Sequence, residues 1–103
     1  MIGLGKWACR VDTMFFRGEA FFTIFDDNGK YGWALEVPGE TIPEIDIHDV
    51  VEDGNTLTAI ANVDLLPGKD IEITATFEAD TFEGLIKIPF IGKIKLKDGK
   101  KVM

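Results

Sequence analysis

Apolar side chains recur at every second position along most of this chain, and this pattern constrains the fold more than any other feature. A period of two is typical of β-strands, because successive side chains of a strand point to opposite faces of the sheet. In the first run, Trp7, Cys9 and Val11 alternate with residues of the other face. The segment Glu19–Asp26 is apolar on both faces and is counted as an eighth strand. The alternating runs lie at residues 6–12, 31–37, 44–48, 57–63, 71–77, 82–88 and 93–97.

Turn-forming residues separate these runs. Gly, Pro, Asn and Asp accept the backbone conformations that tight turns need, and they cluster between the strands. No stretch shows a convincing period of 3.6, so no helix longer than about two turns is expected. The turn signals stand at Gly18, Asp27-Asn28-Gly29, Pro38-Gly39, Asp53-Gly54-Asn55, Pro67-Gly68 and from Pro89 to Gly92.

Eight short strands with short connections predict an all-β fold, in which consecutive strands pair as an antiparallel up-and-down meander. Residues 1–103 are expected to form a single domain, because a chain of this length supports one core. Closure of the meander into a short barrel would remove its exposed edges. The alternative architecture is a flattened β-sandwich. The tail at residues 98–101 is expected to fray.

Composition and charge exclude several classes of protein. The single cysteine, Cys9, rules out an intrachain disulfide framework and favours a cytoplasmic location. The first residues show no basic region followed by a long apolar run, so we expect neither a signal peptide nor a membrane partner. The net charge of −7 argues against nucleic acid as a partner.

The charge is unevenly distributed along the chain. Residues 1–86 contain five basic and 17 acidic residues, whereas residues 87–103 contain six lysines and one aspartate. The basic last strand is expected to pair with acidic neighbours, since opposite charges on adjacent strands stabilise a sheet. The alternative is a strip that binds an anion.

Several short motifs resemble those of a known family. Gly5-Lys6-Trp7 resembles the G-x-W motif that opens the first strand of lipocalins and related calycin barrels. The remaining matches, to a looser pattern of small lipocalin-like bacterial domains, are Gly18, Asp53-Gly54-Asn55, Asp80 to Gly84, and Ile91-Gly92. The resemblance implies a calycin-like barrel that binds a small apolar molecule. Because full lipocalins are longer, it also implies a shorter barrel with a smaller cavity.

The chain departs from lipocalins at one further position. Lipocalins place a basic residue, usually Arg, near the last strand and over the tryptophan of the first strand. In this chain, the resemblance leaves Lys93, Lys95 or Lys97 for that position.

An aromatic-rich interior is the main candidate for a ligand site. The interior row could fill a short barrel completely or could leave a pocket, and the sequence leaves both open. The apolar segment Met14-Phe15-Phe16 stands where the first turn is expected, so it either covers the barrel mouth, contacts another chain or extends the first strand. The candidate ligand-binding residues are Trp7, Phe15, Phe16, Tyr31, Trp33, Phe77 and Phe82.

The second predicted strand cannot hide both of its faces inside a small barrel. If Phe21 and Phe25 point inward, the other face forms an apolar outer patch that soluble monomers rarely leave uncovered. If the strand has the opposite orientation, Phe21 and Phe25 become the exposed residues. We expect the patch to bind a second copy, as a two-fold dimer, or another protein chain. The candidate interface residues are Ala8, Ala20, Phe22, Ile24 and Ala34.

Candidate catalytic chemistry is sparse. His48 is the single histidine and shares a predicted strand face with Glu44 and Asp46. The simpler interpretation of this row is a solvated strand face; the alternatives are a metal site or a general base. Cys9 is expected to be a small core residue. No metal and no cofactor are expected.

Three functions therefore stay open. The first is a lipocalin-like barrel that binds a small apolar or aromatic molecule, associates with itself, or does both. The second is an enzyme or enzyme subunit at the barrel mouth, with His48, Tyr31 or a carboxylate as acid or base. The third is a structural module with a solid core.

Overall fold

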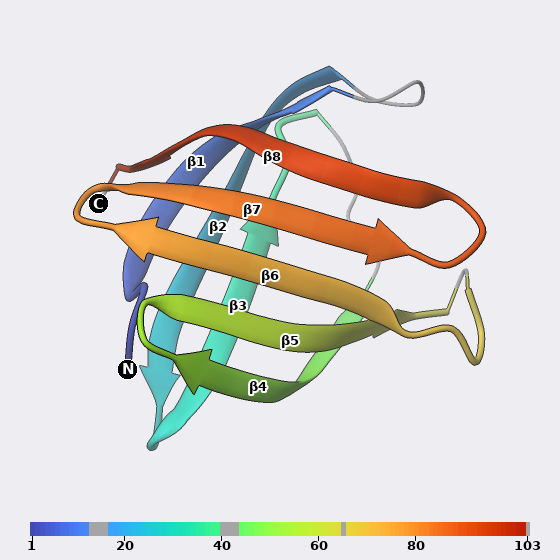
Figure 1. Cartoon of the computed structure of the whole chain (residues 1–103), viewed down its shortest axis with the longest axis horizontal. Coiled ribbons are helices and arrows are strands. Elements are labelled where there is room, and N and C mark those ends of the chain that lie inside the picture. The colour runs from blue at the N-terminus through green and yellow to red at the C-terminus, as the bar shows by residue number, and fades with distance from the viewer. Residues whose placement is uncertain (13–16, 40–43, 65, 103) are drawn as a thin grey trace.

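The computed structural model describes residues 1–12, 17–39, 44–64 and 66–102, which form eight antiparallel β-strands (Figure 1). The all-β prediction is confirmed, and the part of the chain just defined contains no helix. It therefore holds no helical segment long and apolar enough to cross a membrane. The strands are β1 (Gly5–Asp12), β2 (Arg17–Asp27), β3 (Lys30–Glu36), β4 (Ile45–Asp53), β5 (Thr56–Val63), β6 (Ile71–Glu78), β7 (Thr81–Ile88) and β8 (Gly92–Lys101).

The strands form one up-and-down sheet that curls into a nearly closed barrel. Their order is β3-β2-β1-β8-β7-β6-β5-β4, so pairing between β1 and β8 joins the two ends of the chain. In Figure 1, β4 to β8 form the front wall and β1 to β3 cross behind them at a steep angle. The barrel prediction, rather than the flattened sandwich, is thus confirmed.

Closure is incomplete at one place. Within the described residues, β3 and β4 follow each other in the chain but form no ladder. Their connection, residues 37–44, is the longest between consecutive strands. The expectation that closure removes every edge was therefore wrong, and β3 and β4 remain as edge strands beside a gap.

The turn between β2 and β3 follows the prediction made from its residue types. Asn28 (φ 53°) and Gly29 (φ 89°) both adopt left-handed backbone conformations, as the favoured two-residue hairpin turns require. The Gly29 amide donates a hydrogen bond to Asp26 Oδ1 at 2.7 Å. Local chemistry thus sets the register of this hairpin.

A β-bulge in β4 reverses its alternation. The register with β5 shifts between His48 and Val51, where Asp49 has a φ of 52°. Ahead of the bulge, the odd-numbered Ile47 faces the interior; beyond it, Val50 packs against the core. A bulge moves the side chains that follow it to the other face of the sheet. The prediction, which rested on alternation alone, therefore ended this strand at residue 48.

A second bulge extends β8 beyond its predicted end. Asp98 has a φ of 54°, and the pairing with β1 is irregular between Ala8 and Arg10. After it, Lys100 pairs with both Ala8 and Thr81. The expectation that residues 98–101 fray was wrong, because neighbouring strands hold them on both sides.

Aromatic rings fill one end of the barrel. The ring centroid of Trp7 lies 4.9 Å from that of Phe77 and 5.6 Å from that of Phe82, and Phe22 lies 5.0 Å from Phe82. The Trp7 Nε1 group donates to the carbonyl oxygen of Gly3 at 2.8 Å. We call this cluster of Trp7, Phe22, Phe77 and Phe82 the closed end.

Two predicted core residues lie at or beside the closed end. Trp7 is 2% exposed and Cys9 is 4% exposed, so the expected burial of both is confirmed. Burial raises the pKa of the Cys9 thiol to about 11, which keeps it protonated and unreactive at neutral pH. Cys9 therefore behaves as a small core residue.

Candidate functional site

The opposite half of the barrel interior is hollow. A cavity of about 450 Å³ lies there, within the size range of small-molecule sites. Every side chain that lines it is apolar or aromatic. The lining residues are Phe22, Trp33, Ala34, Leu35, Ile45, Ile47, Leu57, Ala59, Ala61, Val63, Ile71, Ile73, Ala75, Phe77, Ile86, Ile88 and Leu96.

Small side chains explain why this half is not filled. On the inner faces of β5 and β6, Ala59 pairs with Ile73 and Leu57 pairs with Ala75. Ala61 pairs with Ile71 on one side and with Ile47 on the other. Each inward position of these two strands is suitably apolar, but the alanines supply too little volume to reach the opposite wall. The same alternation that builds a core therefore leaves a cavity here.

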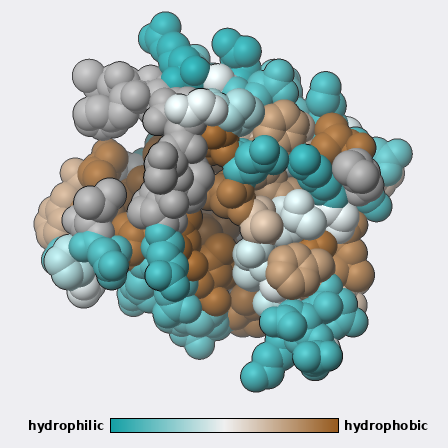
Figure 2. Space-filling model, turned by 180° about the vertical axis from the view of Figure 1, so that it is seen from behind, coloured by the Kyte–Doolittle hydropathy of each residue, from teal (hydrophilic) through white to brown (hydrophobic). Residues whose placement is uncertain are grey.

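The gap between β3 and β4 leads to the cavity. Both unpaired strands contribute to its lining, with Trp33 and Leu35 on one side and Ile45 and Ile47 on the other. Leu35 is 44% exposed, which places it at the rim. Figure 2 shows a hollow with apolar walls on the back of the molecule. We call this half of the barrel the open end.

Polar groups bridge the gap near the start of β3. The Tyr31 hydroxyl donates a hydrogen bond to the Glu52 carboxylate on β4 and accepts one from the Ile2 amide at 2.8 Å. The Met1 amine lies 3.8 Å from Glu52 Oε1. Burial, and then the hydrogen bond to Glu52, raise the pKa of Tyr31. The two edge strands are thus tied together at one end of the gap and are separate at the other.

Trp33, one of the lining residues, carries a polar group that does not face the cavity. Its Nε1 atom is buried, and no hydrogen-bond acceptor reaches it from the described residues. Buried donors of this kind are rare and call for an explanation.

The predicted ligand-binding residues separate into three groups. Trp33 and Phe77 line the cavity. Trp7 and Phe82 belong to the closed end, and Tyr31 bridges the gap, so these three do not form its lining. Phe15 and Phe16, with Met14, lie outside the described residues.

The predicted interface was assigned to the wrong face of β2. Ala20, Phe22 and Ile24 point into the barrel, where Ile24 is only 1% exposed. The reason is cross-strand packing: Phe22 pairs with Trp7, and Ala20 pairs with Cys9, which is also inward. Phe21 and Phe25 therefore face outward.

The two other interface candidates differ in exposure. Ala8 pairs with Phe21 and Lys100 but is 2% exposed, so it offers almost no contact surface. Ala34 is exposed, as expected, and it also lines the cavity at its rim.

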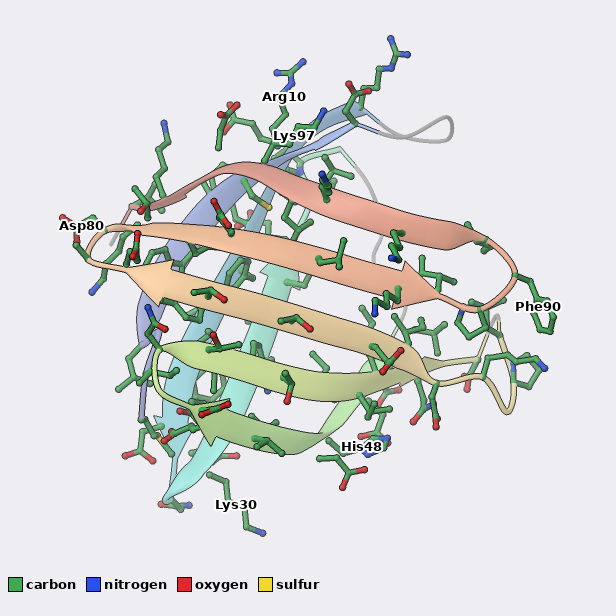
Figure 3. All side chains as sticks on the ribbon, in the orientation of Figure 1. Arg10, Lys30, His48, Asp80, Phe90 and Lys97 are labelled. Atoms are coloured by element: carbon green, nitrogen blue, oxygen red, sulfur yellow. The ribbon has the colours of Figure 1, made fainter. Side chains whose placement is uncertain are left out.

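His48 lies on the outer side of β4, away from the cavity (Figure 3). Its two ring nitrogens face oxygen acceptors, Asn62 Oδ1 and Asp49 Oδ2, the latter at 2.9 Å. These two hydrogen bonds, Asn62 first, raise the pKa of His48. Among residues with a described placement, no three His, Cys, Asp or Glu side chains gather at metal-binding distance. The row with Glu44 and Asp46 therefore forms no ligand set.

The basic residues near the chain's end do not pair with acids on β8's neighbours. Lys93 pairs across the strands with Lys87, and Lys97 pairs with Arg10. Figure 3 shows Arg10 and Lys97 near one another on the outside of the barrel. Between residues that the structure describes, no ion pair within 4.0 Å involves residues 87–102. The expected acidic pairing across the strands was wrong.

The aliphatic part of the lining was missed in the sequence. Ile47, Ala59, Ala61 and Ile73 sit at alternating positions of predicted strands, which identified them as inward but not as ligand-facing. The alanines on β5 were the available signal, since small residues on an inner face leave space. Comparisons with protein families, with curated proteins and with solved structures give no match for this chain.

Proposed function

We propose that this protein is a lipocalin-like barrel that binds a small apolar molecule in the cavity at its open end. The observation that carries the proposal is a cavity of about 450 Å³ lined by apolar and aromatic side chains of the described residues, in a domain whose other half is packed with aromatic rings. Burial of apolar ligand surface in such a cavity is favourable by about 25 cal/mol per Å². The gap between β3 and β4 is the entry route.

The contact over Trp7 supports the relation to lipocalins. Lys101 Nζ, from the last strand, lies 5.9 Å from the centre of the Trp7 ring. The resemblance pointed to Lys93, Lys95 or Lys97 for this position, and that expectation was wrong, because the lysine over the ring is Lys101. The Gly5-Lys6-Trp7 motif and its basic partner together favour a lipocalin-like barrel.

The geometry supports binding over catalysis or a solid core. An enzyme needs a titratable group beside its substrate, and no described side chain that lines the cavity can gain or lose a proton. Tyr31 is engaged by Glu52 outside the lining, and His48 is on the outer surface. A purely structural module would not need the hollow half.

Filling the cavity tests the proposal directly. In the wild-type protein, the uncharged dye N-phenylnaphthylamine should bind with increased fluorescence and should quench or sensitise tryptophan emission, since Trp33 lines the cavity. Ala59→Phe, which adds a ring on the inner face of β5, should weaken dye binding at least about tenfold, a loss of roughly 1.4 kcal/mol.

Thr58→Phe is the matched control, because it adds the same ring to the exposed outer face of the same strand. It should leave dye binding unchanged. Ala59→Leu provides a smaller filling change if the phenylalanine variant is unstable. Equal binding by wild type and both Ala59 variants would mean that the dye does not occupy the cavity, and the proposal would fail.

A second candidate function is self-association through the outer face of β2 and β3. Phe25 is 44% exposed, and its ring lies over Gly32 of the edge strand, where a Cβ would overlap it. Phe21 and Ala34 share this face, where Thr23 pairs with Ala34 and Glu36 pairs with Phe21. A two-fold dimer would cover the same patch on each copy.

Light scattering tests this second candidate. The wild-type protein should have a dimer mass at high concentration, and Phe25→Lys should reduce it to a monomer mass. Phe90→Lys is the control, because Phe90 is 92% exposed but lies on the turn between β7 and β8. A monomer mass for the wild type at all concentrations would exclude self-association.

A further inference from the structure

The turn between β7 and β8 carries the most exposed large apolar side chains of the described residues. Phe90 is 92% exposed and its neighbour Ile91 is 57% exposed. Figure 3 shows Phe90 projecting away from the barrel at the end of this hairpin. Solvated turns ordinarily consist of Gly, Pro, Asn, Asp or Ser, so two large apolar residues here call for an explanation. We call Phe90 and Ile91 the apolar tip.

The backbone holds the apolar tip in an unfavourable conformation. The Ile91 amide donates to the Ile88 carbonyl oxygen at 3.1 Å, which closes a turn over Pro89 and Phe90. Phe90 has a φ of 69°, a left-handed conformation that Gly or Asn usually supplies at this position of a turn. The protein therefore keeps a phenylalanine where glycine would fold with less strain. Such strain is concentrated at functional positions.

Lysines surround the apolar tip. Lys87 and Lys93, which flank the turn, pair with each other across the two strands. Lys69 belongs to the connection between β5 and β6, and its Nζ atom lies 4.7 Å from the centre of the Phe90 ring. An exposed aromatic ring is thus placed among three ammonium groups.

The positive charge continues along the outer face of β8. Leu96 lines the cavity, so strand alternation directs Lys93, Lys95 and Lys97 outward. Lys97 pairs across the strands with Arg10 on β1. Like charges directly opposite each other destabilise a sheet, so this row is not explained by the stability of the barrel.

Acidic side chains lie near this row without pairing with it. Asp70 and Glu72 line a surface depression together with Lys87 and Lys93, and Glu19 is opposite Arg10. Between residues that the structure describes, however, no carboxylate lies within 4.0 Å of any basic group of the row. These cations are therefore available to an external anionic surface.

The apolar tip lies at the end of the barrel to which the cavity extends. Strands of an up-and-down barrel alternate in direction, so the β3–β4, β5–β6 and β7–β8 connections share one end (Figure 1). Cavity-lining residues stand at this end of their strands, since Ile45 begins β4, Val63 ends β5 and Ile88 ends β7. At the opposite end, the turns at residues 28–29, 54–55 and 79–80 consist only of Asn, Gly, Ala and Asp.

We propose that this protein docks on an anionic lipid bilayer by inserting the apolar tip, while the surrounding lysines contact the lipid headgroups. Apolar side chains leave water in the membrane interface, and long lysine side chains keep their ammonium groups at the headgroups. The expectation of no membrane partner rested on the lack of a signal peptide and of a spanning segment, and a surface contact requires neither.

This docking goes beyond the proposed ligand binding and does not depend on it. The contact uses the outer surface of two connections and two strands, whereas the ligand would occupy the interior. Docking would also bring the open end toward the bilayer, in which apolar molecules dissolve.

Co-sedimentation with vesicles tests the docking. The wild type should bind vesicles of equal parts phosphatidylcholine and phosphatidylserine at least about tenfold more tightly than vesicles of phosphatidylcholine alone, because each lysine near an anionic surface contributes about fivefold. Wild-type protein that pellets with neither kind of vesicle, or equally with both, would overturn the proposal.

Four variants separate the apolar tip from the charges. Phe90→Ser should weaken binding to the anionic vesicles at least about tenfold, since it removes the ring that leaves water. Val51→Ser is the matched control, because Val51 is 55% exposed on β4, away from the turn, and it should bind as the wild type does. Lys87→Gln combined with Lys93→Gln should also weaken binding at least about tenfold. Lys30→Gln, at the opposite end, should have little effect.

Phe90→Trp measures insertion while keeping an aromatic ring. Vesicles with brominated acyl chains should quench its added emission, measured against the wild type, whereas the added emission of Val51→Trp should not be quenched. Equal quenching of the two variants would contradict the proposed orientation. Duplex DNA that binds wild type and Phe90→Ser alike, and as tightly as the anionic vesicles bind wild type, would assign the lysines to nucleic acid and overturn the proposal.

Discussion

The two ends of the barrel are built from the same strand pattern and differ in what the pattern encloses. At the closed end, Trp7, Phe22, Phe77 and Phe82 pack ring against ring, with centroids 4.9 to 5.8 Å apart. At the open end, alanines and branched aliphatic residues surround about 450 Å³. Alternation decides which side chains point inward, and side-chain volume decides whether the interior is solid.

The ends also differ in how the barrel wall is closed. The strands that carry the closed end, β1, β2, β6 and β7, each pair on both sides, whereas the open end includes the unpaired edges of β3 and β4. The solid half can therefore stabilise the domain while the hollow half remains accessible. This division suits a binding protein, since ligand entry need not disturb the main core.

The largest expected contrast comes from truncating one residue at each end. Trp7→Ala should lower the free energy of unfolding by about 3–5 kcal/mol, because it opens a hole in packed rings. Ile47→Ala should cost about 2 kcal/mol or less, at the low end for such a change, because Ile47 already borders empty space. Urea denaturation measures both. Equal losses would mean that the open end is packed as tightly as the closed end.

Two glycines that each lie against a residue of the neighbouring strand give a smaller contrast in stability. A Cβ at Gly99 would overlap the carbonyl oxygen of Phe82, which is fixed in a β-ladder at the closed end. Gly99→Ala should therefore destabilise by about 1–3 kcal/mol. A Cβ at Gly32 would meet the ring of Phe25, which is half exposed and can turn outward. Thermal denaturation should show the smaller loss for Gly32→Ala, and the reverse order would contradict this account.

The bridge across the gap is expected to contribute about as much as one hydrogen bond. Tyr31→Phe removes the hydroxyl that joins Ile2 to Glu52, and should lower the free energy of unfolding by about 1 kcal/mol. Amide hydrogen exchange should also become faster in β3 and β4 but not in β1. Unchanged exchange in both edge strands would mean that the bridge does not hold the gap.

The smallest expected effect is the pH dependence of His48. Its pKa is raised in the folded state, so it binds its proton more tightly there than in the unfolded chain. The resulting stabilisation is complete below the unfolded pKa of about 6.5 and is lost as pH rises through the folded pKa. The stability advantage of the wild type over His48→Gln should therefore be larger at about pH 5.5 than at about pH 8.5. A gain at the higher pH would contradict the sign.

The sequence by itself determined the strands, the turns and the burial of Trp7 and Cys9. These follow from local rules, because a strand alternates its side chains every residue and Asn28-Gly29 favours the conformations of a tight turn. Only the tertiary structure decided which face of β2 points into the barrel. Both of its faces are apolar, so its orientation depends on Trp7, which packs beside Phe22.

The cavity also depended on the tertiary structure. Trp33 and Phe77 could be predicted as inward aromatic residues, but the hollow depends on the combined volume of side chains from seven strands. The gap depends on the failure of β3 and β4 to pair, which no local pattern encodes. That Trp33 Nε1 has no acceptor among the described residues could not be predicted from the sequence for the same reason. Whether a buried donor finds an acceptor is decided by residues distant in the chain, which only the folded barrel brings together.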